Sequence, residues 1–150
     1  MKYEELKIAF GTETGTSESM ASDFHELCKQ RSIDSELVDL SEYSIDHLKS
    51  WKNLVVFVST WGEGDPPGDI EDFYCDLEDL EEGELSSLSF SIIALGDSAY
   101  EEFCGCGRKM QEFFEKAGAK AFLPRVELDA DDGDESSFES WKDDFFAVAI

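Results

Sequence analysis

The chain alternates between short, largely apolar runs and longer stretches in which apolar residues recur with a helical period. Three short runs, each bounded by glycine or polar residues, are Leu6–Phe10, Leu54–Val58 and Phe90–Leu95. Runs of this length and composition are typical of strands that are covered on both faces, as in parallel sheets. We therefore expect them to be the central strands of a sheet.

Four other stretches repeat apolar residues every three or four positions, which is the pattern of a helix with one buried face. The apolar sets are Met20, Phe24, Leu27 and Cys28; Ile70, Phe73, Tyr74, Leu77 and Leu80; Met110, Phe113, Phe114 and Ala117; and Phe138, Trp141 and Phe145. They predict four helices. The segment Ser41–Trp51 is expected to be a short helix or an irregular crossover.

Two weaker strand candidates complete the pattern. Ser35–Leu40 is more polar than the central runs, and Ala121–Val126 contains Pro124, which lacks the amide hydrogen that a central strand needs. Both are expected at sheet edges. Five strands with intervening helices predict an α/β fold with a doubly wound parallel sheet in the order 2-1-3-4-5, formed as one domain over residues 1–150.

A polar segment follows each of the three central runs. These segments are Phe10–Glu18, Ser59–Asp65 and Leu95–Cys104. Because the carboxyl ends of parallel strands meet at one edge of the sheet, and open α/β sheets bind ligands there, we expect the three segments to form a single site.

The first of these segments has the composition of a phosphate-binding turn. It is rich in hydroxyls and glycines, namely Thr12, Thr14, Thr16 and Ser17 with Gly11 and Gly15, and no Lys or Arg occurs from Ile8 to Cys28. Hydroxyls and amides at a helix start can hold a phosphate without a cation. The lysine of nucleotide hydrolases and the third glycine of dinucleotide-binding proteins are missing. A turn that only caps the helix is the alternative.

The other two segments each carry one aromatic residue, Trp61 and Tyr100, beside glycine and acidic residues. The two rings are interpreted either as packing at the rim of the sheet or as platforms that enclose a planar ligand. Together with the first segment, they predict a site for a phosphate attached to a flat ring.

The balance of charge is strongly acidic. Twelve Lys and Arg residues stand against 36 Asp and Glu, a formal net charge of −24, and Asn53–Gly107 holds 14 acidic residues and no Lys or Arg. This charge argues against nucleic acid and anionic membranes as partners and favours basic ones. Solubility in a salty cytoplasm is the alternative reason for the excess.

Four cysteines, Cys28, Cys75, Cys104 and Cys106, are too few for a disulfide scaffold, so reduced thiols are expected. Unbroken apolar stretches such as Leu54–Val58 are far too short to cross a bilayer, and the first residues lack the apolar run of a signal peptide. A cytoplasmic location is therefore expected.

Other kinds of site are poorly supported. Cys104 and Cys106 have no histidine beside them, since His25 and His47 lie on other segments, so no metal is expected. The acidic run 129–135 departs from a calcium-binding loop in the place of its glycine and lacks the final glutamate. No catalytic triad or pair of catalytic carboxylates is evident.

The three polar segments, in this order, resemble those of the short-chain flavodoxin family over almost all of the chain. The matching motifs are Thr-Glu-Thr-Gly-Thr-Ser at 12–17, Ser-Thr-Trp-Gly at 59–62 and Gly-Asp-Ser-Ala-Tyr-Glu-Glu-Phe-Cys-Gly at 96–105. The resemblance implies a flavodoxin-like fold and flavin mononucleotide (FMN) as cofactor. The Gly-Glu-Gly-Asp-Pro-Pro sequence at 62–67 is closer to the FMN domains of diflavin reductases.

The resemblance also implies roles by position. Residues 12–17 would hold the phosphate, Ser59 and Thr60 the ribityl chain or phosphate, and Trp61 and Tyr100 would sandwich the flavin. The backbone of Gly62 would meet flavin N5, and backbone groups of Asp97, Tyr100 and Cys104 would read the pyrimidine edge. The complete implied set is Thr12, Glu13, Thr14, Gly15, Thr16, Ser17, Ser59, Thr60, Trp61, Gly62, Glu63, Leu95, Gly96, Asp97, Tyr100, Phe103 and Cys104.

The function that follows is one-electron transfer by a monomeric flavodoxin without a substrate of its own. An NADPH-dependent or ferredoxin-linked reductase would be the donor, and partners would dock through basic surfaces. One alternative is an FMN module of a diflavin reductase. Another is a non-redox phosphate-binding or receiver domain, although Gly11-Thr12 and Ser59-Thr60 stand where a receiver needs its acidic residues.

Overall fold

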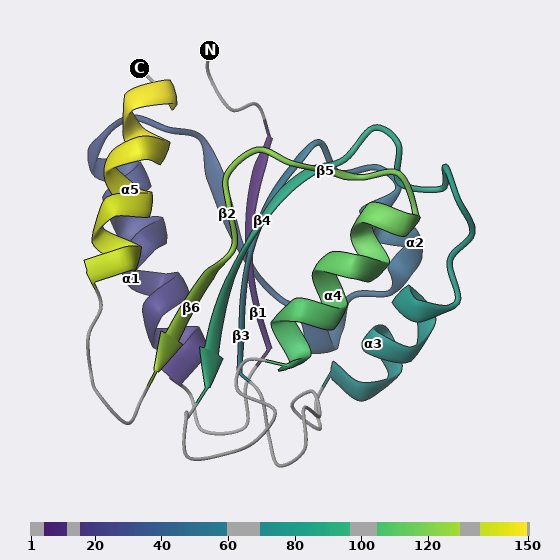
Figure 1. Ribbon diagram of the computed structural model, residues 1–150. Helices are drawn as coiled ribbons and strands as arrows, with labels where there is room; N and C mark the ends of the chain where they lie inside the picture. The colour runs from purple at the N-terminus through teal and green to yellow at the C-terminus, as the bar shows by residue number, and fades with distance from the viewer. Residues whose placement is uncertain (1–4, 12–15, 60–69, 97–104, 130–135, 150) are drawn as a thin grey trace.

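The computed structural model describes residues 5–11, 16–59, 70–96, 105–129 and 136–149. In these ranges a parallel sheet lies between two layers of helices (Figure 1). The strands are β1 (Leu6–Gly11), β2 (Ser35–Asp39), β3 (Asn53–Ser59), β4 (Ser89–Gly96), β5 (Lys120–Ala121) and β6 (Val126–Asp129). The helices are α1 (Thr16–Gln30), η1 (Leu40–Glu42), α2 (Ile45–Leu48), α3 (Glu71–Glu78), α4 (Gly105–Lys116) and α5 (Ser136–Ala149).

The sheet has the predicted order. Its strands run β2-β1-β3-β4-β5, all paired in parallel, and β6 also pairs with β4. The three central strands are the three apolar runs, extended by one or two residues. Between β2 and β3, Ser41–Trp51 contains part of η1 and all of α2, which agrees with the expected short helix.

The prediction of one continuous strand over Ala121–Val126 has to be corrected. The segment lies at the edge, as predicted, but it is divided into β5 and β6, and residues 122–125 are outside both strands. Pro124 lies in this break, where its missing amide hydrogen costs no ladder bond. The two pieces still continue along the same neighbour, because β5 pairs with the start of β4 and β6 with its end.

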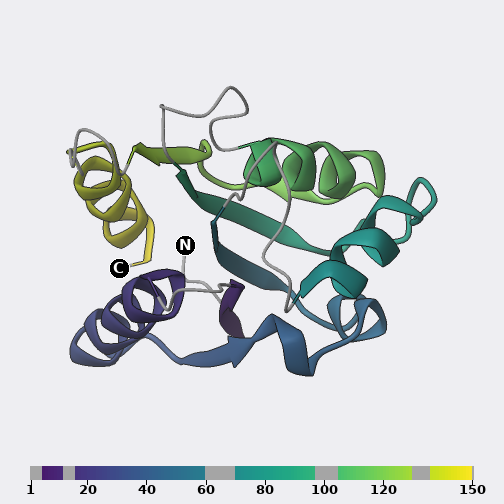
Figure 2. The same ribbon diagram turned by 90° about the horizontal axis from the view of Figure 1, so that it is seen from below.

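Alternate residues of the central strands face two separate cores. In β3, Leu54, Val56 and Val58 pack with α3 and α4, whereas Val55 and Phe57 pack with α1 and α5. Figures 1 and 2 show the corresponding layers, with α1 and α5 on one face and α2, α3 and α4 on the other. Because both faces are covered, the central strands are largely apolar, as the sequence indicated.

Two helices end in left-handed turns. After α1, Ser32 has φ 60° and the Ile33 amide donates to the Cys28 carbonyl at 2.9 Å. After α4, Gly118 has φ 98° and the Ala119 amide donates to the Phe114 carbonyl at 3.0 Å. These bonds satisfy carbonyls that would otherwise be left open at a helix end, and they turn the chain back toward the sheet.

Candidate functional site

The carboxyl ends of the three central strands lie side by side. Gly11 is opposite Val58, Val58 is opposite Ala94, and Ser59 is opposite Leu95. Figure 2 views the sheet from this edge. The three strands therefore end at nearly the same level of the sheet, and the three polar segments begin side by side there. A shared ligand site requires this arrangement.

Five residues of the implied FMN site fall in the described ranges. Ser59 ends β3, Leu95 and Gly96 end β4, and Thr16 and Ser17 begin α1. Leu95 is half-buried and packs against the core beneath α1 and α5. The other implied residues lie outside the described residues: Thr12, Glu13, Thr14, Gly15, Thr60, Trp61, Gly62, Glu63, Asp97, Tyr100, Phe103 and Cys104.

Ser17 is the most informative of the five. Its side chain is completely buried, and its Oγ has no hydrogen-bond partner among the described residues. Ser91, the other fully buried serine of these ranges, does have partners: its Oγ donates to the Leu123 carbonyl and accepts from Trp141 Nε1. A buried hydroxyl without a partner costs free energy. The Ser17 hydroxyl is therefore available to donate a hydrogen bond at the start of α1.

That donor suits an anion. Amide groups at the start of a helix are open, and the helix dipole favours negative charge there. A phosphate placed against the first turn of α1 would accept a hydrogen bond from Ser17 Oγ. The residues present therefore fit the phosphate of FMN.

The surface of α3, which follows the second polar segment, is strongly acidic. Its exposed carboxylates are Glu71, Asp72, Asp76 and Glu78, with Asp79 directly after the helix. No Lys or Arg lies on α3. Cys75 is exposed among these residues; partial desolvation and the neighbouring carboxylates raise the pKa of its thiol, so the thiolate is disfavoured.

A partly buried carboxylate fastens α4 to the edge of the sheet. Arg108 near the start of α4 binds Glu127 of β6 through two hydrogen bonds of 3.0 and 3.1 Å. Arg125 adds a third bond of 3.0 Å to Glu127 and also donates to Gln111 at 2.9 Å. Burial would raise the pKa of Glu127, but the two guanidinium groups outweigh it and lower the pKa. The start of α4 is thereby held close to the end of β6.

Two residues near the site were not identified from the sequence as parts of it. Asp129 was assigned to an acidic loop, but it ends β6 and lies opposite Gly96, at the carboxyl edge. Ile70 was assigned to the core, and it does lie there, but it also contacts Gly11 at the end of β1. The only available signal was that Asp129 begins an acidic run three residues after the predicted edge strand.

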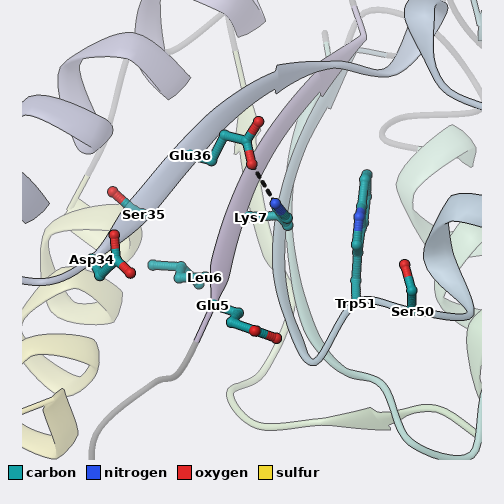
Figure 3. Close-up of a pocket in the computed structure, with 8 residues that line it drawn as sticks. All are labelled: Glu5, Leu6, Lys7, Asp34, Ser35, Glu36, Ser50 and Trp51. Atoms are coloured by element: carbon teal, nitrogen blue, oxygen red, sulfur yellow. Dashed lines mark hydrogen bonds and ion pairs between the residues drawn. The ribbon is translucent and has the colours of Figure 1, made fainter.

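A hollow of about 300 Å³ lies at the opposite, amino edge of the sheet (Figure 3). Its lining residues are Glu5, Leu6, Lys7, Asp34, Ser35, Glu36, Ser50 and Trp51. Figure 3 shows Lys7 directed toward Glu36, with which it forms an ion pair, and the Lys7 Nζ is 6.0 Å from the centre of the Trp51 ring. This hollow contains none of the implied FMN residues.

The thiols and possible metal ligands indicate no second centre in the described ranges. Cys28 and Cys106 are buried and form no disulfide within the described ranges, and burial raises the pKa of Cys28 to about 12. No group of three or more His, Cys, Asp or Glu side chains within those ranges is placed to hold a metal ion. Within the same ranges, no helix is both long and apolar enough to cross a membrane.

Comparison with known proteins decides the family. The flavodoxin family model matches residues 8–141, which include all three polar segments and helices α1 to α4 in full. The chain belongs to the flavodoxin family. FMN is therefore its cofactor and electron transfer its role, as the resemblance in the sequence implied.

Solved flavodoxins share this fold. A cysteine-to-serine mutant of flavodoxin from Pseudomonas aeruginosa superimposes with a TM-score of 0.81 at 28% identity, covering 98% of this chain and 99% of that one. A flavodoxin from Streptococcus pneumoniae TIGR4 superimposes with a TM-score of 0.80 at 24% identity, covering 96% of this chain and 99% of that one. The second likeness supports the fold alone.

Relatives among well-characterised proteins are larger flavoproteins. The sulfite reductase [NADPH] flavoprotein alpha-component of Bacillus subtilis is 34% identical over 128 residues, which cover 85% of this chain and 21% of the relative. The corresponding protein of Vibrio parahaemolyticus is 33% identical over 137 residues, 91% of this chain and 22% of the relative. This flavodoxin-family chain thus spans about a fifth of these relatives.

Proposed function

We propose that FMN binds at the carboxyl edge of the sheet, held by the three segments that follow β1, β3 and β4. Residues 12–17 would take the phosphate, Ser59 and Thr60 the ribityl chain, and Trp61 and Tyr100 the two faces of the flavin. The observation that carries the proposal is Ser17, whose buried Oγ lacks a partner among the described residues at the start of α1. A bound phosphate would supply that partner.

Bound FMN supplies the one-electron chemistry, and the protein supplies binding and electrostatics. Hydroxyls and helix-start amides bind the phosphate without a cation from the segment between Ile8 and Cys28. Trp61 and Tyr100 would enclose the ring and limit the access of water. The backbone of Gly62 would hold flavin N5 by a hydrogen bond. The chain then needs no substrate of its own.

The preferred role is that of a separate carrier between a reductase and a redox enzyme. An NADPH-dependent or ferredoxin-linked flavoprotein would be the donor, and the acceptor is a redox enzyme with a basic docking surface. The second candidate is an FMN module that works within, or in trans with, a diflavin reductase. The relatives named as NADPH sulfite reductase flavoproteins, of which this chain matches about a fifth, favour that candidate.

Partners would approach the acidic face formed by α3. Its exposed carboxylates have no Lys or Arg on the same helix, although Lys116 of α4 donates to the Glu78 carbonyl at 2.9 Å, so the charge of this face is predominantly negative. Such a surface steers basic partners and makes association faster at low ionic strength. The protein would act as a monomer in the cytoplasm and would not bind nucleic acid or membranes.

The test of FMN binding is a titration of the flavin-free protein with FMN and with riboflavin. FMN should bind more tightly, because only FMN presents a phosphate to Ser17 and the residues before it. Equal affinities would remove the phosphate from the proposed site. A purified protein without the absorption of bound flavin and with no affinity for FMN would contradict the whole proposal.

A separate experiment tests docking through α3. The FMN-loaded chain is mixed with an NADPH-dependent reductase that carries its own FAD, and reduction of FMN is followed by absorbance at several ionic strengths. A carrier should be reduced in a second-order reaction that slows steeply as salt rises. A rate independent of salt would contradict docking through α3.

A further inference from the structure

Gly11, the last residue of β1, and Ile70, the residue before α3, touch at the carboxyl edge of the sheet. A Cβ built on Gly11 would lie 2.7 Å from Ile70 Cδ1, 2.9 Å from Cγ2 and 3.2 Å from Cγ1, so its three nearest neighbours all belong to Ile70. Ile70 is only 1% exposed and lies in the core beneath α3 and α4. The contact is therefore a packed one in which Ile70 fills the space beside the glycine.

Space, and not backbone conformation, requires glycine at position 11. Among the described glycines, positive φ occurs at Gly83 and Gly118, whereas Gly11 lies in extended strand paired with Val58. Any residue can adopt that backbone. An alanine would nevertheless push against Ile70, and a β-branched side chain has little freedom to turn away, so the backbone before α3 would have to move.

The contact joins two of the three segments assigned to FMN. Gly11 directly precedes residues 12–17, and Ile70 follows the segment Ser59–Asp65, which carries Trp61 and Gly62, after four further residues. We propose that Gly11 and Ile70 are positioning residues that set the spacing between the phosphate segment and the first flavin segment. This inference rests on the proposed FMN site. It predicts that the two residues control FMN affinity and potential as a coupled pair.

The test is a double-mutant cycle on the FMN-loaded protein with Gly11→Ala, Ile70→Val and the double variant. FMN dissociation is measured from the flavin fluorescence that appears on dilution, and the midpoint potentials are measured by reductive titration. Gly11→Ala should weaken FMN binding roughly tenfold and shift the potentials. Ile70→Val removes Cδ1 but leaves Cγ2 at 2.9 Å from the new Cβ, so it should change affinity less than about twofold alone and restore only part of the loss in the double variant.

Two controls separate positioning from general destabilisation. Gly118→Ala makes the same substitution after α4, where φ is 98°, and should lower the unfolding midpoint without changing FMN dissociation. If Gly11→Ala does not fold, Ile70→Ala is compared with Leu77→Ala, a truncation of a fully buried residue farther along the same face of α3. The two variants should lower the unfolding midpoint by similar amounts, but only Ile70→Ala should weaken FMN binding.

Independent effects of Gly11→Ala and Ile70→Val on FMN dissociation would overturn the inference, as would equal FMN affinities in Ile70→Ala and Leu77→Ala. Both results leave the FMN site itself intact. Failure of the proposed function shows earlier and differently, as an absence of FMN binding in the unaltered protein.

Discussion

The indole Nε1 of Trp141 on α5 donates a 2.9 Å hydrogen bond to the Oγ of Ser91, a fully buried residue of β4. The Trp141 ring also stacks on Phe145, with centroids 5.3 Å apart. A polar residue in a fully covered strand is thereby satisfied, and the last helix is attached to the sheet at a definite register.

Ser91→Ala should destabilise the fold because it leaves the Trp141 N–H buried without its acceptor. We expect a loss of about 1–3 kcal/mol in the free energy of unfolding, measured in urea. Trp141→Phe, which keeps an aromatic ring but removes the donor, should also be destabilising. The double variant should lose less than the sum of the two changes. Strict additivity would show that the bond contributes little.

Ser17→Ala should weaken FMN more than riboflavin. The substitution removes the buried hydroxyl that fits the phosphate and leaves the flavin contacts unchanged. We expect a loss of roughly 1–3 kcal/mol in FMN binding free energy. Ser19→Ala, at an exposed position of the same helix, is the matched control. The same loss for both flavins would place Ser17 away from the phosphate.

Trp61→Ala and Tyr100→Ala should each weaken FMN binding by roughly 1–3 kcal/mol, the scale of base stacking on aromatic rings. Fluorescence titration measures the affinity, and quenching of tryptophan emission in the loaded protein should diminish in Trp61→Ala. Trp51→Phe, in the hollow at the amino edge, should leave FMN affinity unchanged. Unaltered affinity in both alanine variants would show that neither ring is a platform.

Glu127 should contribute to acid sensitivity. Its pKa is lowered in the folded protein by Arg108 and Arg125, so its ionised form stabilises the fold above its ordinary pKa of 4.5. This contribution is lost as pH falls from 4.5 through the folded pKa. Unfolding in urea at several pH values should therefore show a smaller decline in acid for Glu127→Gln than for Glu112→Gln, an exposed control on α4. Identical declines would contradict this.

The acidic surroundings should lower the potential of the second one-electron reduction of FMN below that of free FMN. Adding a second electron increases negative charge in a chain with a net charge of −24. Asp72→Asn and Asp76→Asn on α3 should raise that potential by on the order of 10 mV each at low salt. Reductive titration followed by absorbance measures both steps. A single two-electron step would contradict the expectation.

Local patterns predicted most of the fold. The largely apolar runs of β1, β3 and β4 follow directly from burial on both faces, and the apolar stripes of α1, α3, α4 and α5 follow from burial on one. Both patterns are properties of neighbouring residues in the chain. The break between β5 and β6 was harder to predict from the sequence, because Pro124 indicates an edge position but not the residue at which pairing with β4 resumes.

By itself, the sequence determined the strand order, the edge at which the three polar segments leave the sheet, and their resemblance to flavodoxins. Only the tertiary structure decided which individual groups are satisfied. Ser17 and Ser91 are both fully buried serines, yet Trp141, which is 50 positions from Ser91, satisfies one of them and no described residue satisfies the other. The contact of Gly11 with Ile70 likewise joins residues distant in the chain. Such contacts depend on how separate elements pack together, so the periodicity of residues within one element cannot predict them.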